Sequence, residues 1–197
     1  MRPLGFKAKS DTLFYRLTDK DVLHTVGFEL SPIGFTCFVA IQPLYAYDHT
    51  VVFHYSFGAR LSRFRTLQQE WWNYENTEDG LDEIEKLLIK NGMPWFDEFG
   101  SPEGIVRFIN KKLGRRYGVN FDDDDIFLGF SYFYLGQIEK GKRCIREYFE
   151  GIADDAADFI FTYKNELVDL MNRITADNVH SILADIANAN KNILKIC

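Results

Sequence analysis

Residues 22–44 read VLHTVGFELSPIGFTCFVAIQPL, and this stretch decides the fold class. Two apolar runs, residues 22–30 and 35–44, lie on either side of the turn sequence at 31–34. Strands joined by a short turn pair antiparallel. The second run is apolar on both faces, which is typical of a central strand. The stretch therefore predicts a β-hairpin in the middle of an antiparallel sheet.

The first of these runs alternates in the way a strand requires. Successive side chains of a strand point to opposite faces, so every second residue shares a face. One face of this strand is predicted to hold the side chains of Val22, His24, Val26, Phe28 and Leu30.

Shorter runs on either side extend the hairpin into a larger sheet. Residues 12–17 precede it across the polar turn 18–21, and residues 50–58 follow it. β-branched and aromatic residues, which favour strands, dominate both runs. We expect an antiparallel meander of about four strands within the first 65 residues.

Apolar residues follow a helical period after residue 80. Leu81, Ile84, Leu87 and Leu88 predict one helix, and the pair at 91–92, Asn-Gly, predicts its end. The aromatic segment 93–100 is interpreted as a connector. Ser101, Pro102 and Glu103 then provide a cap, a first-turn proline and a first-turn acid, so a second helix is predicted over 101–113.

The rest of the chain predicts helices only, over residues 126–135, 139–149, 154–173 and 177–194. Glycines, charges and a change of composition place a boundary at 114–121. We therefore expect an α+β domain over 1–114, with an antiparallel β-meander packed with helices, and a four-helix acidic region over 122–197.

The last two predicted helices carry apolar stripes. Steps of three and four connect Ala156, Ile160, Tyr163, Leu167, Leu170 and Ile174 in one helix, and Val179, Ile182, Ile186, Ala189 and Ile193 in the other. Helices with such stripes pack at small crossing angles. We expect an antiparallel hairpin of these two helices, capped at Thr175.

Charge is distributed unevenly along the 197 residues. Residues 1–121 hold 15 basic and 15 acidic residues, whereas residues 122–197 hold 8 and 14, which accounts for the net charge of −6. DNA- and RNA-binding proteins need a basic face, so a dedicated nucleic-acid binder is not expected. No apolar run approaches the length of a membrane span and the N-terminus lacks a secretory signal, so we expect a cytoplasmic protein.

The three cysteines, Cys37, Cys144 and Cys197, form no CxxC pair. An odd number at wide spacings does not indicate a zinc site or a disulfide framework, so reduced thiols are expected.

Several short blocks carry a family resemblance. They are PLGFKAK at 3–9, TLFYR at 12–16, DVLHTVGF at 21–28, the pair Trp71-Trp72 and PWF at 94–96. Through these blocks, residues 1–113 resemble a bacterial family known as domain of unknown function 4304. The resemblance implies a bacterial α+β domain and brings no known activity.

A second, weaker resemblance lies at residues 127–149, which are similar to a single tetratricopeptide-type helix hairpin. Gly129 and Gly141 would let the two helices approach closely, as they do in that repeat. Only one unit matches, so no repeat array is expected.

Motifs that carry a catalytic mechanism are missing from the chain. It contains no HExxH, GxSxG, GxxxxGK[ST] or GxGxxG sequence. We therefore expect no metal site, no cofactor and no catalytic residue, and we favour a protein that is not an enzyme.

The candidate binding residues are arginines and tryptophans, the types most enriched at interaction hot spots. They are Arg60, Arg63, Trp71, Trp72 and Trp95. Trp71 and Trp72 are adjacent and cannot both point inward, so one of them should lie near the surface. A purely structural role, with a core tryptophan and solvated arginines, is the competing interpretation.

Two classes of function follow. The leading hypothesis is a non-catalytic protein-binding module, of immunity or regulatory type, that presents its acidic helices to a protein partner; a homodimer through the C-terminal helices is a further expectation. The alternative is an enzyme with a pocket between sheet and helices that uses His54, Arg60 and Tyr55. His24, on the apolar face of its strand, is interpreted as a hydrogen-bonded core residue.

Overall fold

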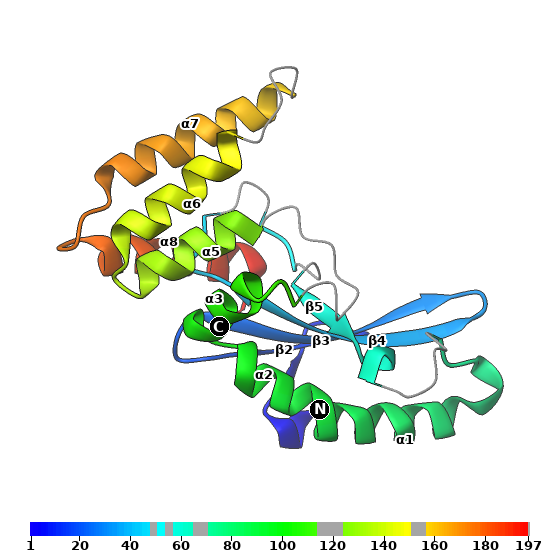
Figure 1. Ribbon diagram of the computed structural model, residues 1–197. Coiled ribbons are helices and arrows are strands. Elements are labelled where there is room, and N and C mark those ends of the chain that lie inside the picture. The colour runs from blue at the N-terminus through cyan, green and yellow to red at the C-terminus, as the bar shows by residue number, and fades with distance from the viewer. Residues whose placement is uncertain (48–50, 54–56, 65–70, 114–123, 151–156, 197) are drawn as a thin grey trace. The chain divides into compact units, whose positions relative to one another are not determined.

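The computed structural model describes residues 1–47, 51–53, 57–64, 71–113, 124–150 and 157–196 (Figure 1). The chain forms two compact units, and each is described by itself. Unit 1 comprises Met1–Gln42 and His54–Phe121, and unit 2 comprises Pro43–Phe53 and Asp122–Cys197. The segment predicted as a boundary, 114–121, lies outside the described residues. The strands belong to unit 1 and unit 2 is helical, which confirms the α+β class.

The sheet of unit 1 has five strands in the order of the sequence. They are β1 (Lys7–Ala8), β2 (Leu13–Leu17), β3 (Val22–Ser31), β4 (Gly34–Pro43) and β5 (Gly58–Arg60). The pairs β1–β2, β2–β3 and β4–β5 are antiparallel; Tyr15 lies opposite Thr25, and Val39 opposite Ala59. The predicted antiparallel meander is therefore confirmed.

Two details of the predicted sheet were wrong. The strand expected over 50–58 is a short strand at Gly58–Arg60, and residues 51–53 are not in a strand. The remaining residues of that run, 48–50 and 54–56, lie outside the described part. β1 was not predicted, because two residues are too few to show an alternating pattern.

The turn of the central hairpin depends on Gly34. Its φ is 155°, and a β-carbon there would collide with the backbone carbonyl of Trp72. The chain passes this close because Phe35 and Trp72 exchange two backbone hydrogen bonds of 2.8 Å each. A glycine at position 34 therefore allows residues 71–72 to pair with the start of β4.

The first helices of unit 1 continue past residues 91–92, where the sequence predicted a helix end. Helix α1 (Thr77–Leu87) continues through the π turn η4 (Leu88–Gly92) directly into α2 (Met93–Phe99), so the expected helix end at 91–92 and the connector at 93–100 were wrong. Gly92 is helical, with φ −66°. A β-carbon there would crowd Leu88, Leu61 and Val39, so this glycine serves close packing rather than helix termination.

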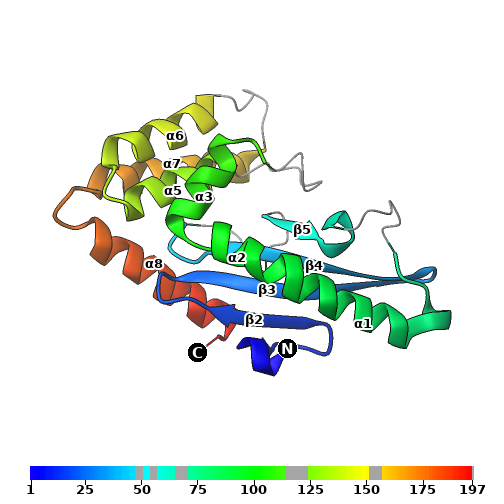
Figure 2. The same ribbon diagram turned by 60° about the horizontal axis from the view of Figure 1, so that its bottom comes forward.

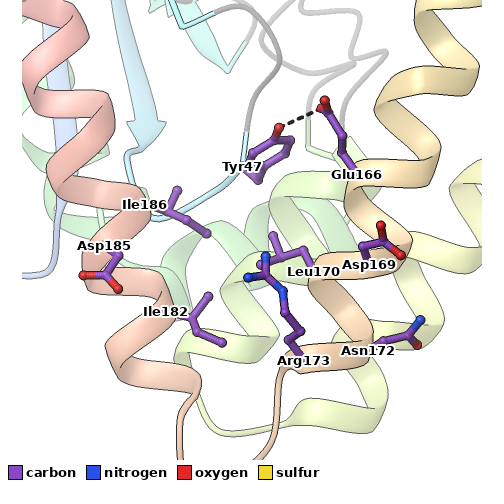
Figure 3. Close-up of a pocket in the computed structure, with 9 residues that line it drawn as sticks. All are labelled: Tyr47, Glu166, Asp169, Leu170, Asn172, Arg173, Ile182, Asp185 and Ile186. Carbon is purple, nitrogen blue, oxygen red and sulfur yellow. Dashed lines mark hydrogen bonds between the residues drawn. The ribbon is translucent and has the colours of Figure 1, made fainter.

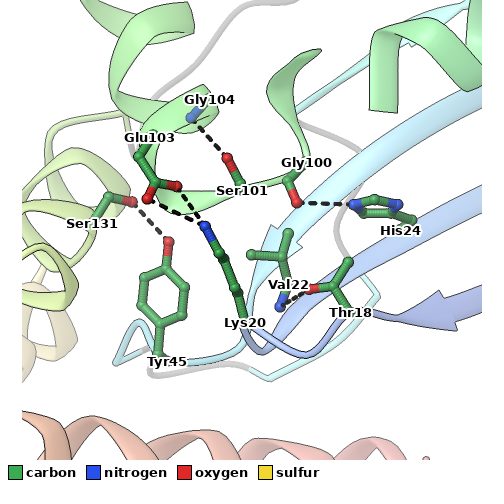
Figure 4. Close-up of polar contacts among 10 residues, drawn as sticks. All are labelled: Thr18, Lys20, Val22, His24, Tyr45, Gly100, Ser101, Glu103, Gly104 and Ser131. Atoms are coloured by element: carbon green, nitrogen blue, oxygen red, sulfur yellow. Dashed lines mark hydrogen bonds and ion pairs between the residues drawn. The ribbon is translucent and has the colours of Figure 1, made fainter. Parts of the chain in front are cut away.

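Helix α3 (Pro102–Asn110) begins as predicted. Ser101 Oγ accepts a hydrogen bond of 3.1 Å from the Gly104 N–H, as an N-cap does (Figure 4). Glu103 in the first turn pairs with Lys20 at 3.1 Å. Three short 3-10 turns complete unit 1: η1 (Arg2–Leu4), η2 (Leu61–Phe64) and η3 (Tyr74–Asn76).

Helices α1 and α2 lie along one face of the sheet (Figures 1 and 2). His24 on β3 stacks on Phe96 of α2, with 4.6 Å between ring centroids. Behind this contact lies a cluster of aromatic rings from α2, α3 and the residue before β5: Phe57, Trp95, Phe99 and Phe108. The high aromatic content thus fills the core of unit 1.

Unit 2 contains four described helices, α5 (Asp124–Tyr134), α6 (Ile138–Glu150), α7 (Asp158–Arg173) and α8 (Val179–Leu194). The closest pair is α5–α6. Gly129 and Gly141 face each other there: a β-carbon on Gly141 would lie 2.5 Å from Phe133 and 2.7 Å from the Gly129 carbonyl oxygen. The predicted close approach of two helices at these glycines is confirmed.

The antiparallel packing at a small crossing angle predicted for the last two helices was wrong, because α7 and α8 diverge from their connection and leave a cleft between them (Figure 3). The N-cap of α8 is Asn178 and not the predicted Thr175, and both residues take part in the connection. The Asn178 side chain accepts from the Thr175 N–H and donates to the Arg173 carbonyl, both at 2.8 Å.

Of the stripe predicted for α8, only Val179 belongs to the buried face of the helix. The buried residues are Val179, Leu183, Ala187, Asn190 and Leu194. Of the predicted stripe, Ile182 and Ile186 are half-buried and Ile193 is 59% exposed. The helix is apolar on two faces, so its period alone does not identify the face that packs inward.

Residues 43–47 cross from the sheet into unit 2 and are fixed there by polar contacts. Asn190 of α8 donates two hydrogen bonds, to the carbonyls of Leu44 at 2.8 Å and Ala46 at 3.0 Å. The Tyr45 hydroxyl lies 3.0 Å from Ser131 Oγ of α5 (Figure 4). This segment is therefore part of the helical core of unit 2.

Candidate functional site

The residues predicted as a binding set differ in their surroundings. Arg60 forms an ion pair of 2.9 Å with Glu29 and lies over the half-buried ring of Trp71, 5.8 Å from its centroid. Arg63 is exposed on η2. Arg60 and Trp71 are therefore in contact beside β5.

The other two tryptophans belong to the core. Trp72 is 6% exposed and donates from Nε1 to Glu83 at 2.8 Å. Trp95 is 3% exposed, within the aromatic cluster. Trp72 therefore points inward while Trp71 stays near the surface, as two adjacent side chains require. The groove beside this pair is small, about 210 Å³.

His24 is held as a neutral core residue. Its Nδ1 accepts from Arg16 Nε at 3.1 Å, and its Nε2 lies 3.1 Å from the Gly100 carbonyl, so the proton belongs on Nε2 (Figure 4). Burial lowers its pKa to about 4, and the neighbouring Arg16 adds to this, while the Gly100 hydrogen bond acts in the opposite direction. The expectation of a hydrogen-bonded core histidine is confirmed.

The remaining titratable candidates offer no catalytic group in the described part. Cys37 is fully buried in β4, and burial raises the pKa of its thiol far above its ordinary value. Cys144 is buried as well. His54, Tyr55 and Cys197 lie outside the described residues, so the pocket of His54, Arg60 and Tyr55 stays a prediction.

A larger site lies in unit 2, between the diverging helices α7 and α8 (Figure 3). We call it the α7–α8 cleft. Its volume is about 770 Å³. It is lined by Tyr47, by Glu166, Asp169, Leu170, Asn172 and Arg173 of α7, and by Ile182, Asp185 and Ile186 of α8.

The cleft has an apolar floor and a charged rim. Leu170, Ile182 and Ile186 are buried or half-buried, whereas the polar lining residues of both helices are exposed. The rim holds three carboxylates, of Glu166, Asp169 and Asp185, against the one guanidinium of Arg173. The site is thus apolar at its base and acidic at its edges.

Tyr47 closes one end of the cleft. Its hydroxyl donates to Glu166 Oε2 at 2.7 Å, and its carbonyl accepts from the Tyr163 hydroxyl at 3.0 Å. Burial, together with the hydrogen bond and negative charge of Glu166, raises the pKa of Tyr47 to about 12. Tyr47 therefore stays a neutral donor that fixes Glu166.

The lining combines apolar side chains with three carboxylates, one guanidinium, one amide and one phenol. No lining residue is a histidine, cysteine, serine or lysine. Across the described ranges, no group of three or more His, Cys, Asp or Glu side chains is placed to hold a metal ion. A ligand in the cleft would contact apolar side chains with negative charges on either side.

Sequence analysis missed this cleft although it singled out three of its residues, Leu170, Ile182 and Ile186. Ile182 and Ile186 belong to the apolar stripe that was interpreted as a helix–helix contact. The second apolar face of α8 was the available signal, because one face packs inward and the other remains for a partner.

Comparisons with known proteins give one finding. A family model described as Domain of unknown function (DUF4304) matches residues 1–98. No curated protein matches the chain, and no solved structure does. Among the described helices, none has both the length and the apolar character that crossing a membrane demands.

Proposed function

Since residues 1–98 belong to the family called Domain of unknown function (DUF4304), which brings no activity with it, we propose a function from the α7–α8 cleft. The chain is a non-catalytic protein-binding module, and the cleft receives a basic amphipathic segment of a partner protein. The observation that carries the proposal is an apolar floor of Leu170, Ile182 and Ile186 beneath an acidic rim.

The shape of the cleft favours a helical segment. Two helices that diverge form an open groove, and an amphipathic helix binds such a groove by placing its apolar face on the floor. Most of the residues that bound the groove on α7 and α8 are exposed, so a long segment can enter from the side. A small polar metabolite would find few buried polar groups to fix its orientation.

The charge of the rim selects the partner. Lysine and arginine side chains beside the apolar face of the segment would lie next to Asp169 and Asp185. The acidic residues of the last 76 positions act in the same direction at longer range. An acidic module of immunity or regulatory type would bind a basic protein in this way.

The test uses two synthetic peptides with the same helical pattern, one of leucine and lysine and one of leucine and glutamate. We expect the leucine–lysine peptide to bind in calorimetry and the leucine–glutamate peptide not to bind. The double variant Asp169→Asn/Asp185→Asn should weaken binding about tenfold, since each lost charge pair contributes up to about 1 kcal/mol.

The matched control is Asp158→Asn/Asp177→Asn, which removes two exposed acids of unit 2 that do not line the cleft. It changes the net charge equally and should leave the affinity near that of the parent protein. Equal weakening by both double variants would reject the cleft and leave only a general charge effect. Sedimentation of the free protein in the same buffer tests the predicted homodimer separately.

A further inference from the structure

Unit 1 contains a cavity of its own, distant in sequence from the α7–α8 cleft. It has a volume of about 370 Å³ and lies between the N-terminal turn η1, strand β3 and helix α1. Its lining is Met1, Pro3, Leu4, Val26, Phe28, Leu81, Ile84, Glu85, Leu88 and Ile89. We call it the β3–α1 cavity.

The lining is almost entirely hydrocarbon. Glu85 is its only charged side chain, and it is exposed at the edge. The backbone at the floor is used within the sheet: Val26 pairs with Phe14, and the Phe28 N–H donates to the Thr12 carbonyl at 2.8 Å. A buried water needs two to four polar partners, which this floor does not provide.

Specific contacts hold the walls of the cavity in place. Arg16 Nη1 donates to the Leu4 carbonyl at 3.4 Å, which fixes η1 against the sheet. On the opposite side, Leu88 and Ile89 belong to the π turn η4. A π turn strains a helix and is frequent at functional sites.

Two large apolar side chains stand exposed at the edge, Leu81 at 44% and Ile89 at 51%. An apolar ligand seated against them would remove this surface from water. Every lining residue lies within residues 1–98, the part of the chain that the family model matches. The cavity therefore belongs to the family domain and not to the helical unit.

We propose that the β3–α1 cavity binds a small uncharged apolar molecule, of the alkyl-chain class. Its volume lies in the range of small-molecule sites, about 300 to 1,000 Å³. Its lining provides dispersion contacts, and its one charged side chain, Glu85, lies at the exposed edge, so burying a charged or sugar-like ligand there would be unfavourable. The inference is independent of the proposed function, which rests on unit 2.

The experiment uses 1-N-phenylnaphthylamine, an uncharged probe whose fluorescence rises in apolar surroundings, and 1-decanol as its competitor. The full-length protein should bind the probe at one site, and decanol should displace it. Leu81→Asp and Ile89→Asp should weaken probe binding about tenfold each, because each replaces apolar contact surface at the edge of the cavity with a charge.

Matched controls exist on the same unit. Leu30 is 62% exposed and Ile33 is exposed as well, and neither lines the cavity. Leu30→Asp and Ile33→Asp should therefore leave probe binding unchanged. Equal losses in all four variants, or no saturable binding by the parent protein, would overturn the proposal.

One further variant keeps the test meaningful if an aspartate disturbs α1. Ile89→Trp adds volume at the edge, where the side chain is free to turn into the cavity. It should abolish probe binding while circular dichroism and the melting temperature stay at or above those of the parent. Full probe binding by a folded Ile89→Trp protein would contradict the site.

Discussion

His24 lies between the ring of Phe96 and the side chain of Arg16, where its protonation state is fixed by two contacts. Nδ1 accepts from Arg16, so a second proton would have to replace that hydrogen bond and sit beside a positive charge. The neutral ring is therefore the form that the folded protein stabilises.

This state predicts a loss of stability in acid. The pKa of His24 is lowered from 6.5 to about 4, so the unfolded chain binds a proton between these values that the folded protein does not. The stability is fully present above pH 6.5 and falls as the pH drops toward 4, by at most about 3 kcal/mol. Urea unfolding at pH 7 and pH 4 measures this change.

His24→Gln is the control for that prediction, because glutamine does not titrate in this range. The variant should lose less stability than the parent protein between pH 7 and pH 4. An equal loss in both proteins would show that groups other than His24 carry the acid sensitivity.

Asn190 gives a second prediction for a single residue. Its amide donates to two backbone carbonyls, of Leu44 and Ala46, in a buried position. Asn190→Asp has the same shape but replaces the donor with an acceptor, so it should cost about 2–4 kcal/mol and the cost should shrink in acid. Asn188→Asp, on the exposed side of the same helix, should be nearly neutral in thermal unfolding.

Among the elements, the pair α5–α6 depends on two glycines. Gly141→Ala places a methyl group against Phe133 and the Gly129 carbonyl, and a backbone carbonyl cannot move aside cheaply. We expect a loss of about 1–3 kcal/mol in chemical unfolding, despite the better helix propensity of alanine. Gly136→Asn is the control, since Gly136 has φ 71° with open space around it and asparagine tolerates that conformation. Equal stability of Gly141→Ala and the parent would contradict the close packing.

Several elements could be predicted from sequence because their signals are local. The alternation at 22–44 predicts the central hairpin, Ser101 predicts the start of α3, and Gly129 with Gly141 predicts a close helix pair. Each of these depends on neighbours in sequence or on side-chain size. These signals can therefore be recognised in the sequence without knowledge of contacts between distant segments.

Other elements depend on packing between distant residues. Gly92 follows an asparagine, as a helix end does, yet it is used to let η4 approach Val39 of β4. The cleft arises because α7 and α8 diverge. An apolar stripe indicates that one face of a helix will be covered, but it does not identify whether a neighbouring helix or a partner covers it. The predicted binding residues all lie in unit 1, whereas the α7–α8 cleft lies in unit 2.

At the scale of the whole molecule, charge adds to the local chemistry of the cleft. Residues 122–197 hold 14 acidic and 8 basic residues, and the first 121 are balanced. Binding of the leucine–lysine peptide should therefore weaken as salt rises, since the screening length falls to about 10 Å at 0.1 M salt and about 3 Å at 1 M. Calorimetry at increasing sodium chloride concentration measures this dependence. An affinity that does not depend on salt would show that charge does not contribute to peptide binding.

The most direct test of the central claim is to locate the bound peptide. Titrating ¹⁵N-labelled protein with the leucine–lysine peptide should shift the amide signals of α7 and α8 around Leu170, Asn172, Ile182 and Ile186, and leave those around Arg60 and Trp71 in place. Shifts confined to unit 1, or no shifts at millimolar peptide, would contradict the α7–α8 cleft as the binding site of this protein.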